Sequence, residues 1–138
     1  MTTRMIYLSR MAYLTFAWLF VAGILFQVFL VGLGLFAGQQ TWSTHVGFGH
    51  WFGIVPLLLV ILSFAGRLPR SEKRLTASMF GVYLVQAEVF AAIRQAAPTT
   101  AALHPVLALI LFALGLLVAQ RARALTREPL EIHSGAIK

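Results

Sequence analysis

The sequence contains no cysteine and no aspartate, and its acidic side chains are four scattered glutamates. Without cysteine, the chain forms no disulfide, holds no iron–sulfur cluster and attaches no haem through a thioether. Without closely spaced carboxylates, it lacks the paired acids on which many hydrolases rely. Charged residues make up 11% of its 138 residues, whereas an average soluble domain has about 25%. The composition therefore points away from an ordinary soluble domain.

Apolar residues make up 59% of the chain and gather in four long stretches. A transmembrane helix needs about 20 predominantly apolar residues, and suitable stretches cover residues 11–37, 45–65, 75–93 and 101–119. The first is too long for the core of a signal peptide. Short connections between the stretches favour antiparallel neighbours. We therefore expect an all-α membrane protein, an up-down-up-down bundle of four transmembrane helices within residues 1–124, followed by a short cytoplasmic tail at 125–138.

The basic residues predict the orientation, because short loops rich in Lys and Arg stay on the cytoplasmic side. Ten of the eleven basic residues lie before the first stretch, between the second and third, or after the fourth, and only Arg94 lies at the opposite side. Both termini should therefore be cytoplasmic, in a multi-pass protein of the bacterial inner membrane. We expect no nucleic-acid partner, because the basic residues are spread over three segments without interleaved aromatic residues.

The strongly polar side chains inside the four stretches all fall in the outer half of the membrane. At 1.5 Å per residue, His45 and His104 lie near the outer boundary, His50 and Glu88 about 10 Å below it, and Gln27 and Gln86 at about 14 Å. The inner half of these stretches is apolar, with runs such as PLLLVIL and LILFAL. Any chemistry should therefore take place near the outer face.

Glu88 is the clearest intramembrane ionisable residue, and such residues usually face the bundle interior and find a partner there. His50 lies at the same expected depth on the adjacent span, so we expect a hydrogen bond or ion pair between Glu88 and His50. Arg94 is a second candidate partner. The alternative is a neutral, protonated Glu88 that is bonded to a backbone carbonyl.

The histidines suggest a cofactor site. His45 and His50 are separated by about 140° around a helix, so they cannot both face one small centre. His104 opens the fourth stretch, and the following Pro105 suits a first helical turn. In a four-helix bundle, the second and fourth helices lie on a diagonal of about 12–14 Å, and a haem iron takes one imidazole from each side. We therefore predict a haem b with His45 and His104 as axial ligands, His50 replacing His45 if its helix begins earlier.

Other residues would surround this haem. We expect His50, Gln86 and Glu88 to support the ligands, Gly49 to relieve crowding beside the ring, and Trp51 to pack against the ring. Alternatively, the histidines and tryptophans at the helix entrances form an aromatic belt at the membrane surface. A zinc site needs three or four converging ligands, which the staggered depths do not favour.

Four segments in order, FQVFLVGLGLFAG, HVGFGH, YLVQAE and LHPVLALILFALG, together resemble a family of small bacterial four-span membrane proteins of unknown function. The resemblance covers most of residues 10–120. It implies a helical membrane fold with a histidine near the start of spans two and four, here His45 and His104, and it implies no activity. A looser similarity to b-type cytochrome bundles rests on this pair alone.

Two functional hypotheses follow from the sequence. The first is a haem-b-binding membrane protein that carries electrons near the outer face or senses haem. An electron carrier is favoured over a catalyst, because no Ser–His–Asp set or nucleotide-binding glycine loop can be assembled. The second is a non-catalytic subunit or scaffold of a larger membrane complex or homo-oligomer, with or without a chlorophyll-type pigment on one histidine. Small residues of the first span favour helix docking of this kind: Gly23, Gly32, Gly34 and Gly38.

Overall fold

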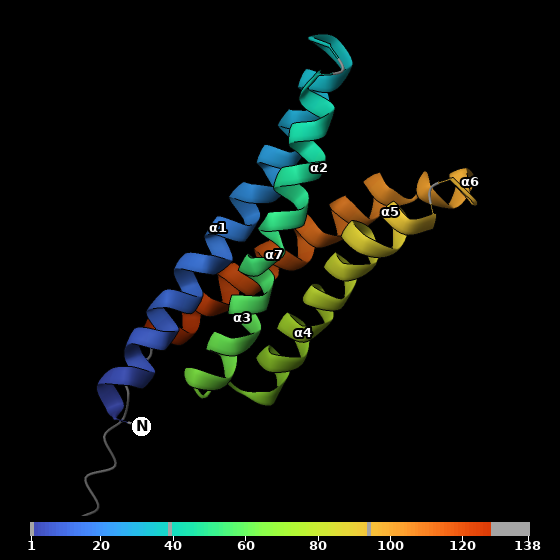
Figure 1. The fold of residues 1–138 in the computed structure, drawn as a ribbon. Helices are drawn as coiled ribbons and strands as arrows, with labels where there is room; N and C mark the ends of the chain where they lie inside the picture. Colours follow the sequence, from blue (N-terminus) through green and yellow to red (C-terminus); the bar gives the residue numbers. More distant parts are fainter. Residues whose placement is uncertain (1, 39, 94, 128–138) are drawn as a thin grey trace, which may run out of the picture.

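The computed structural model describes residues 2–38, 40–93 and 95–127 of the chain, which are all-helical. The elements are α1 (Thr3–Phe36), α2 (Gln40–Phe52), α3 (Ile54–Ala65), α4 (Arg70–Leu84), the π-helix η1 (Val85–Val89), α5 (Phe90–Ile93), α6 (Pro98–Ala101) and α7 (His104–Arg127). They form four long segments: α1, α2 with α3, α4 with η1 and α5, and α7 (Figure 1).

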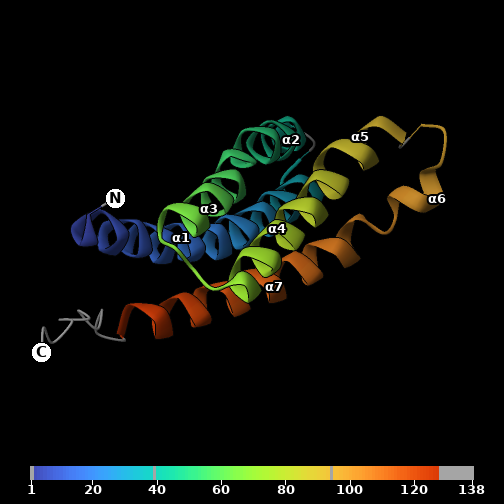
Figure 2. The ribbon, with the colours of Figure 1, turned by 90° about the horizontal axis from the view of Figure 1, so that it is seen from below.

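The two ends of the molecule differ. The start of α1, the connection from α3 to α4 and the end of α7 lie together at one end, which we call the basic end (Figures 1 and 2). At the other end, α1 and α2 run to one side while α5, α6 and the start of α7 run to another (Figure 1), and we call this the splayed end. The turn from α1 to α2 contains Gly38 at φ +121°, a conformation that a glycine adopts without a steric penalty.

Three helices are long and apolar enough to cross a membrane: Thr3–Phe36, Thr41–Ala65 and Pro98–Thr126. The expectation of membrane-spanning helices is confirmed to that extent. The third expected stretch, residues 75–93, is helical in its described part, but it divides between α4, the π-helix η1 and α5 and is not among these three.

Several helices extend beyond the apolar stretches that were predicted to cross the membrane, because polar residues that flank an apolar run can continue the helical hydrogen bonding. Helix α1 begins at Thr3, eight residues earlier than predicted, and α2 begins at Gln40 instead of residue 45. Helix α7 continues to Arg127, so the first three residues of the expected tail, 125–127, are helical. Residues 128–138 and Arg94 lie outside the described residues.

The second segment is interrupted at Gly53, between α2 and α3. Pro56 has no amide hydrogen, so it cannot bond the carbonyl of Phe52 four residues earlier, and the hydrogen-bond ladder is broken there. The Gly53 amide instead donates to the His50 carbonyl over 3.3 Å. The α-helical hydrogen bonding is therefore interrupted between α2 and α3, within a helical run that continues over Thr41–Ala65.

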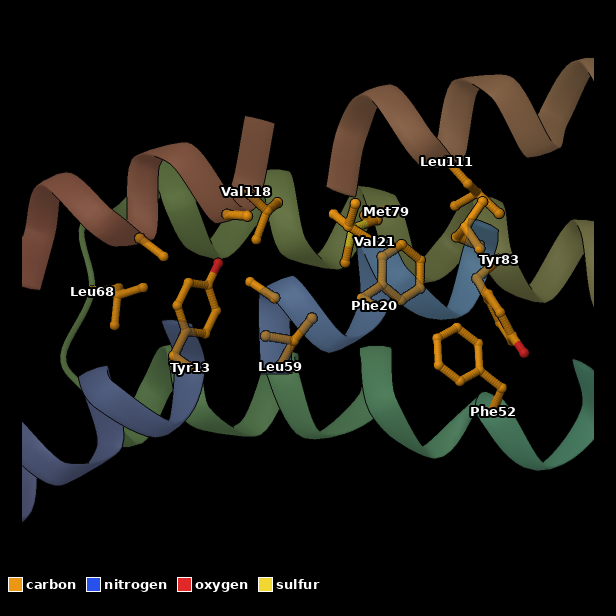
Figure 3. Close-up of a cluster of buried hydrophobic side chains, with 14 residues drawn as sticks. Tyr13, Phe20, Val21, Phe52, Leu59, Leu68, Met79, Tyr83, Leu111 and Val118 are labelled. Atoms are coloured by element: carbon orange, nitrogen blue, oxygen red, sulfur yellow. The ribbon is translucent and has the colours of Figure 1, made fainter. Parts of the chain in front are cut away.

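Helix α1 is the central packing element. It contacts α2, α3 and α7, while α4 contacts α3 and α7. The largest fully buried side chains of the core come from all four segments and include Tyr13, Phe20, Leu59, Met79, Leu111 and Val118 (Figure 3). The second and fourth segments therefore both flank α1.

Aromatic rings join three of the segments. The Phe20 ring of α1 stacks on Phe52 of α2 with centres 5.6 Å apart, and Phe52 stacks on Phe48 at 5.1 Å. Tyr83 of α4 meets Phe20 edge-on at 6.3 Å (Figure 3). Such pairs add about 0.5–1.5 kcal/mol each beyond area burial, so this stack holds α2 against α1 and α4.

A polar cluster that the sequence analysis did not identify joins the segments near the basic end. The Thr76 hydroxyl donates to the Glu72 carbonyl over 2.8 Å, so the Tyr13 hydroxyl must be the donor in its 2.6 Å bond to Thr76. Arg121 of α7 pairs with the buried Glu72 of α4, with 3.1 Å between Nη1 and Oε1. These contacts connect α1, α4 and α7.

The close approach at Gly23 gives a testable prediction. A Cβ atom added there would overlap the Phe52 ring, so Gly23→Ala must displace the aromatic stack at a cost of about 1–3 kcal/mol. Gly32→Ala is the matched control on the same helix: its Cβ meets no heavy atom within 4 Å, and the better helix former should keep or raise stability. Midpoints of thermal unfolding in detergent measure both, and equal midpoints would contradict the packing.

Candidate functional site

Two histidines meet at the splayed end. His45 lies on α2 and His104 is the first residue of α7, and their ring centres are 6.1 Å apart with planes inclined at 72°. Both rings are half-buried. The structure therefore brings together the two residues that the sequence analysis selected as axial ligands.

Backbone carbonyls orient both rings. His45 Nδ1 lies 3.3 Å from the Gln27 carbonyl of α1, and the His104 ring faces the backbone carbonyl of Gln86 in η1. A carbonyl oxygen only accepts, so His45 Nδ1 must carry the hydrogen. In the neutral imidazole the lone pair is then on Nε2. Ligating histidines are commonly held in this way by a backbone carbonyl.

The amide side chains of the same two residues are unusual. Among the described residues, Gln27 Oε1 and Gln86 Oε1 are buried side-chain oxygens without a hydrogen-bond partner. A buried polar atom without a partner costs about 1–3 kcal/mol, so such atoms are uncommon unless a site uses them. Both lie on residues whose carbonyls hold the histidine pair.

The π-helix η1 positions Gln86. It runs over Val85–Val89, and the Phe90 amide bonds the Val85 carbonyl five residues earlier. Single π-helical turns of this kind occur frequently at functional sites, because they alter the direction of side chains and backbone groups within an otherwise regular helix. Here the turn carries Gln86 toward α7 and Glu88 toward α2.

The predicted contact between His50 and Glu88 is confirmed, with 3.2 Å between His50 Nδ1 and Glu88 Oε1. This pair is a second, separate feature, since His45 faces His104 and Gln27 instead. Both side chains of the pair are exposed, by 68% for His50 and 52% for Glu88. The alternative partner Arg94 lies outside the described residues. Although α2 begins earlier than predicted, His50 does not take the place of His45.

Two further predicted site residues, Gly49 and Trp51, differ in their distance from the histidine pair. Gly49 faces Gln27, whose Nε2 lies 2.5 Å from the position of a Cβ atom at Gly49, and the Gly49 carbonyl accepts a hydrogen bond from Tyr83. Trp51 is 80% exposed and its ring meets His50 at 6.3 Å. Of these two, only Gly49 borders the residues that hold His45.

Sequence reasoning missed two residues around His45. Trp42 stacks on the His45 ring with centres 5.3 Å apart, and its position three residues earlier on the same helical face was a usable signal. Gln27 was placed too deep to reach His45, because the second helix was expected to begin five residues late. No group of three or more His or Glu side chains gathers as a metal site within residues 2–38, 40–93 and 95–127.

Comparison with known proteins gives one match. The model of a family of unknown function (DUF6220) matches residues 27–92, a range that contains the Gln27, His45, His50, Gln86 and Glu88 positions and ends before His104. The predicted resemblance to a family of unknown function is thereby confirmed, while its four-span description and the cytochrome similarity stay predictions. No curated protein and no solved structure matches the chain.

The unpartnered amide oxygens predict an unusual response to substitution. Met has nearly the shape of Gln but no buried oxygen, so Gln27→Met and Gln86→Met should keep or raise the unfolding midpoint of the ligand-free protein, by up to about 1 kcal/mol in stability. Gln120→Met, at an exposed position of α7, is the control and should change little. A clear loss of stability in both buried variants would show that the amides serve the protein's own packing.

Proposed function

We propose that the chain is a haem-b-binding integral membrane protein, and that His45 and His104 are the axial ligands of the iron. The separation of the two rings is the observation that carries this proposal. Imidazole nitrogens bind metals at about 2 Å, so two imidazoles on opposite sides of one iron keep their ring centres about 6 Å apart. The separation here is 6.1 Å.

The surroundings of the rings also fit this donor set. The Gln27 carbonyl holds His45 by Nδ1, which leaves Nε2 as the metal-binding nitrogen. A bound haem b supplies one-electron redox chemistry, and its potential depends on the axial ligands and on their hydrogen bonds. The chain's own residues would orient the imidazoles and shield them from water, in a protein that carries electrons near the outer face or senses haem.

Other candidate cofactors and roles fit less well. A chlorophyll-type pigment needs one imidazole, whereas two approach each other here. A scaffold would use the small residues of α1 for docking, but only two of the four glycines are open, Gly32 and Gly38. Gly23 is covered by Phe52, and Trp42 and Thr41 approach Gly34. The haem proposal uses the observed pair, and we therefore favour it.

We further propose that all four segments cross the bacterial inner membrane in an up-down-up-down bundle, with α4, η1 and α5 as the third span. The basic residues support this orientation. Among the described residues they lie in the first turns of α1, at the α3–α4 connection and the start of α4, or along the end of α7. These three places gather at the basic end (Figures 1 and 2). By the positive-inside rule, the basic end and both termini are cytoplasmic.

Haem binding is tested by absorption spectroscopy of protein purified after expression with ample haem. We expect a Soret band and, after reduction, a sharp α-band typical of an iron with two imidazole ligands. His45→Ala and His104→Ala should each abolish this spectrum, because each removes one axial ligand. His50→Ala should retain it, since His50 pairs with Glu88. A folded, colourless wild-type protein would overturn the proposal.

The orientation is tested by introducing single cysteines. The chain contains no native cysteine, so no other residue gives a labelling background. Cysteine at Ala37 or Thr99, near the splayed end, should react with a membrane-impermeant maleimide added outside intact spheroplasts. Cysteine at Thr3 or Ser71, near the basic end, should react only after permeabilisation. Both regions are exposed in the structure, so a cysteine that does not react is shielded from the maleimide by the membrane and not by the fold. Labelling of Thr3→Cys from outside would contradict cytoplasmic termini.

A further inference from the structure

The His50–Glu88 pair lies on the lateral surface between α2 and η1. Both residues belong to the interior of helical elements and neither lies in a loop. His50 is roughly 14 Å along the helix from Thr41, at 1.5 Å per residue, within a segment long enough to cross the membrane. More than half of each side chain is nevertheless exposed.

This exposure is unusual for the proposed setting. Ionisable side chains at membrane depth are costly and almost always face the bundle interior or a water-filled cavity. Here the pair is open to the side, where the proposed bundle meets hydrocarbon. Within the part of the chain that the structure describes, Glu88 makes its ion pair with His50 alone, through Oε1. A carboxylate has about four lone-pair sites, so acceptor capacity remains for a ligand.

The surface beside the pair suits a flat, apolar ligand. Trp51 is 80% exposed and its ring lies next to His50. Gly47, about one turn before His50, would meet no heavy atom within 4 Å if it carried a Cβ, so the surface above the pair is open. Val85 and Val89 of η1 add exposed apolar side chains around Glu88.

We propose that the His50–Glu88 pair is a lateral binding site for the head group of a lipid-soluble hydroquinone. A hydroxyl of the head group donates a hydrogen bond to the Glu88 carboxylate, the aromatic ring lies beside Trp51, and the tail stays among the lipids. The site is separate from the histidine pair of α2 and α7, and this proposal does not require haem.

The chemistry of the pair selects this ligand class. The ligand must arrive through hydrocarbon, which excludes sugars, nucleotides and free ions. It must donate a hydrogen bond to a carboxylate, which excludes phosphate groups. Amine head groups of phospholipids donate hydrogen bonds, but they lie at the membrane surface, above the depth of His50. A phenolic hydroxyl on a lipophilic ring meets all three requirements, and its bond to a charged acceptor is among the stronger hydrogen bonds.

Binding is tested on the full chain in lipid nanodiscs, with decylubiquinol as the probe under anaerobic conditions. A Trp18→Phe/Trp42→Phe variant leaves Trp51 as the single tryptophan reporter, whose fluorescence the bound ring should quench in a saturable way. The matched control ligand is the same molecule with its phenolic hydroxyls methylated, which keeps the ring and the tail but donates no hydrogen bond. We expect about tenfold weaker binding of this ether, the change typical for loss of one charge-assisted hydrogen bond.

Two variants complete the test in the same reporter background. Glu88→Gln removes the charge while keeping the shape, and should weaken decylubiquinol binding by about tenfold. Gly47→Leu fills the open surface beside His50 without touching the core, and should weaken binding similarly even if Glu88→Gln fails to fold. Equal quenching by the hydroquinone and its ether, or wild-type affinity in the folded variants, would mean that decylubiquinol only partitions into the lipid. Either result would overturn the proposed site. The Soret band reports on haem independently, so each proposal can fail alone.

Discussion

Polar contacts set the position of α2, and the rest of the splayed end depends on that position. Inside a bilayer, helices gain little from the hydrophobic effect, because lipid tails are as apolar as the side chains they replace. In addition to the aromatic stack, α2 is held by His45 on the Gln27 carbonyl, by His50 on Glu88, and by the Tyr83 hydroxyl on the Gly49 carbonyl. These contacts come from different faces of α2, so together they fix both its rotation and its height.

The π-helix η1 connects the two sites of the molecule. One turn presents the Gln86 carbonyl to His104 and the Glu88 carboxylate to His50. π-Helical turns are rare, and this one contacts both α2 and α7. The third segment is the least apolar of the four because this turn contains Gln86 and Glu88, which contact the neighbouring helices.

The sequence predicted the number of helical segments and several contacts, but fewer of the boundaries. The four apolar stretches are helical. The contact between His50 and Glu88 could be predicted because each residue lies only a few turns from a helix end, so its depth could be counted from there. The contact of His45 with Gln27 was missed because polar residues 41–44 gave no sign that the helix had already begun. Nothing in VQAEV marks a π-helix, as it contains neither Pro nor Gly. Tyr13 and Thr76 were overlooked because a single hydroxyl hardly changes the apolar character of a segment.

The break at Gly53 has a mechanical consequence. Helix α3 belongs to the firmly joined half of the molecule, where Leu59 is fully buried, whereas α2 is attached to it through an interrupted ladder. The direction of α2 relative to α3 is therefore set by the contacts that α2 makes with α1, α4 and η1. Because His45 and His50 lie on this one helix and face different neighbours, a shift of α2 at one imidazole also moves the other, in addition to the connection through η1.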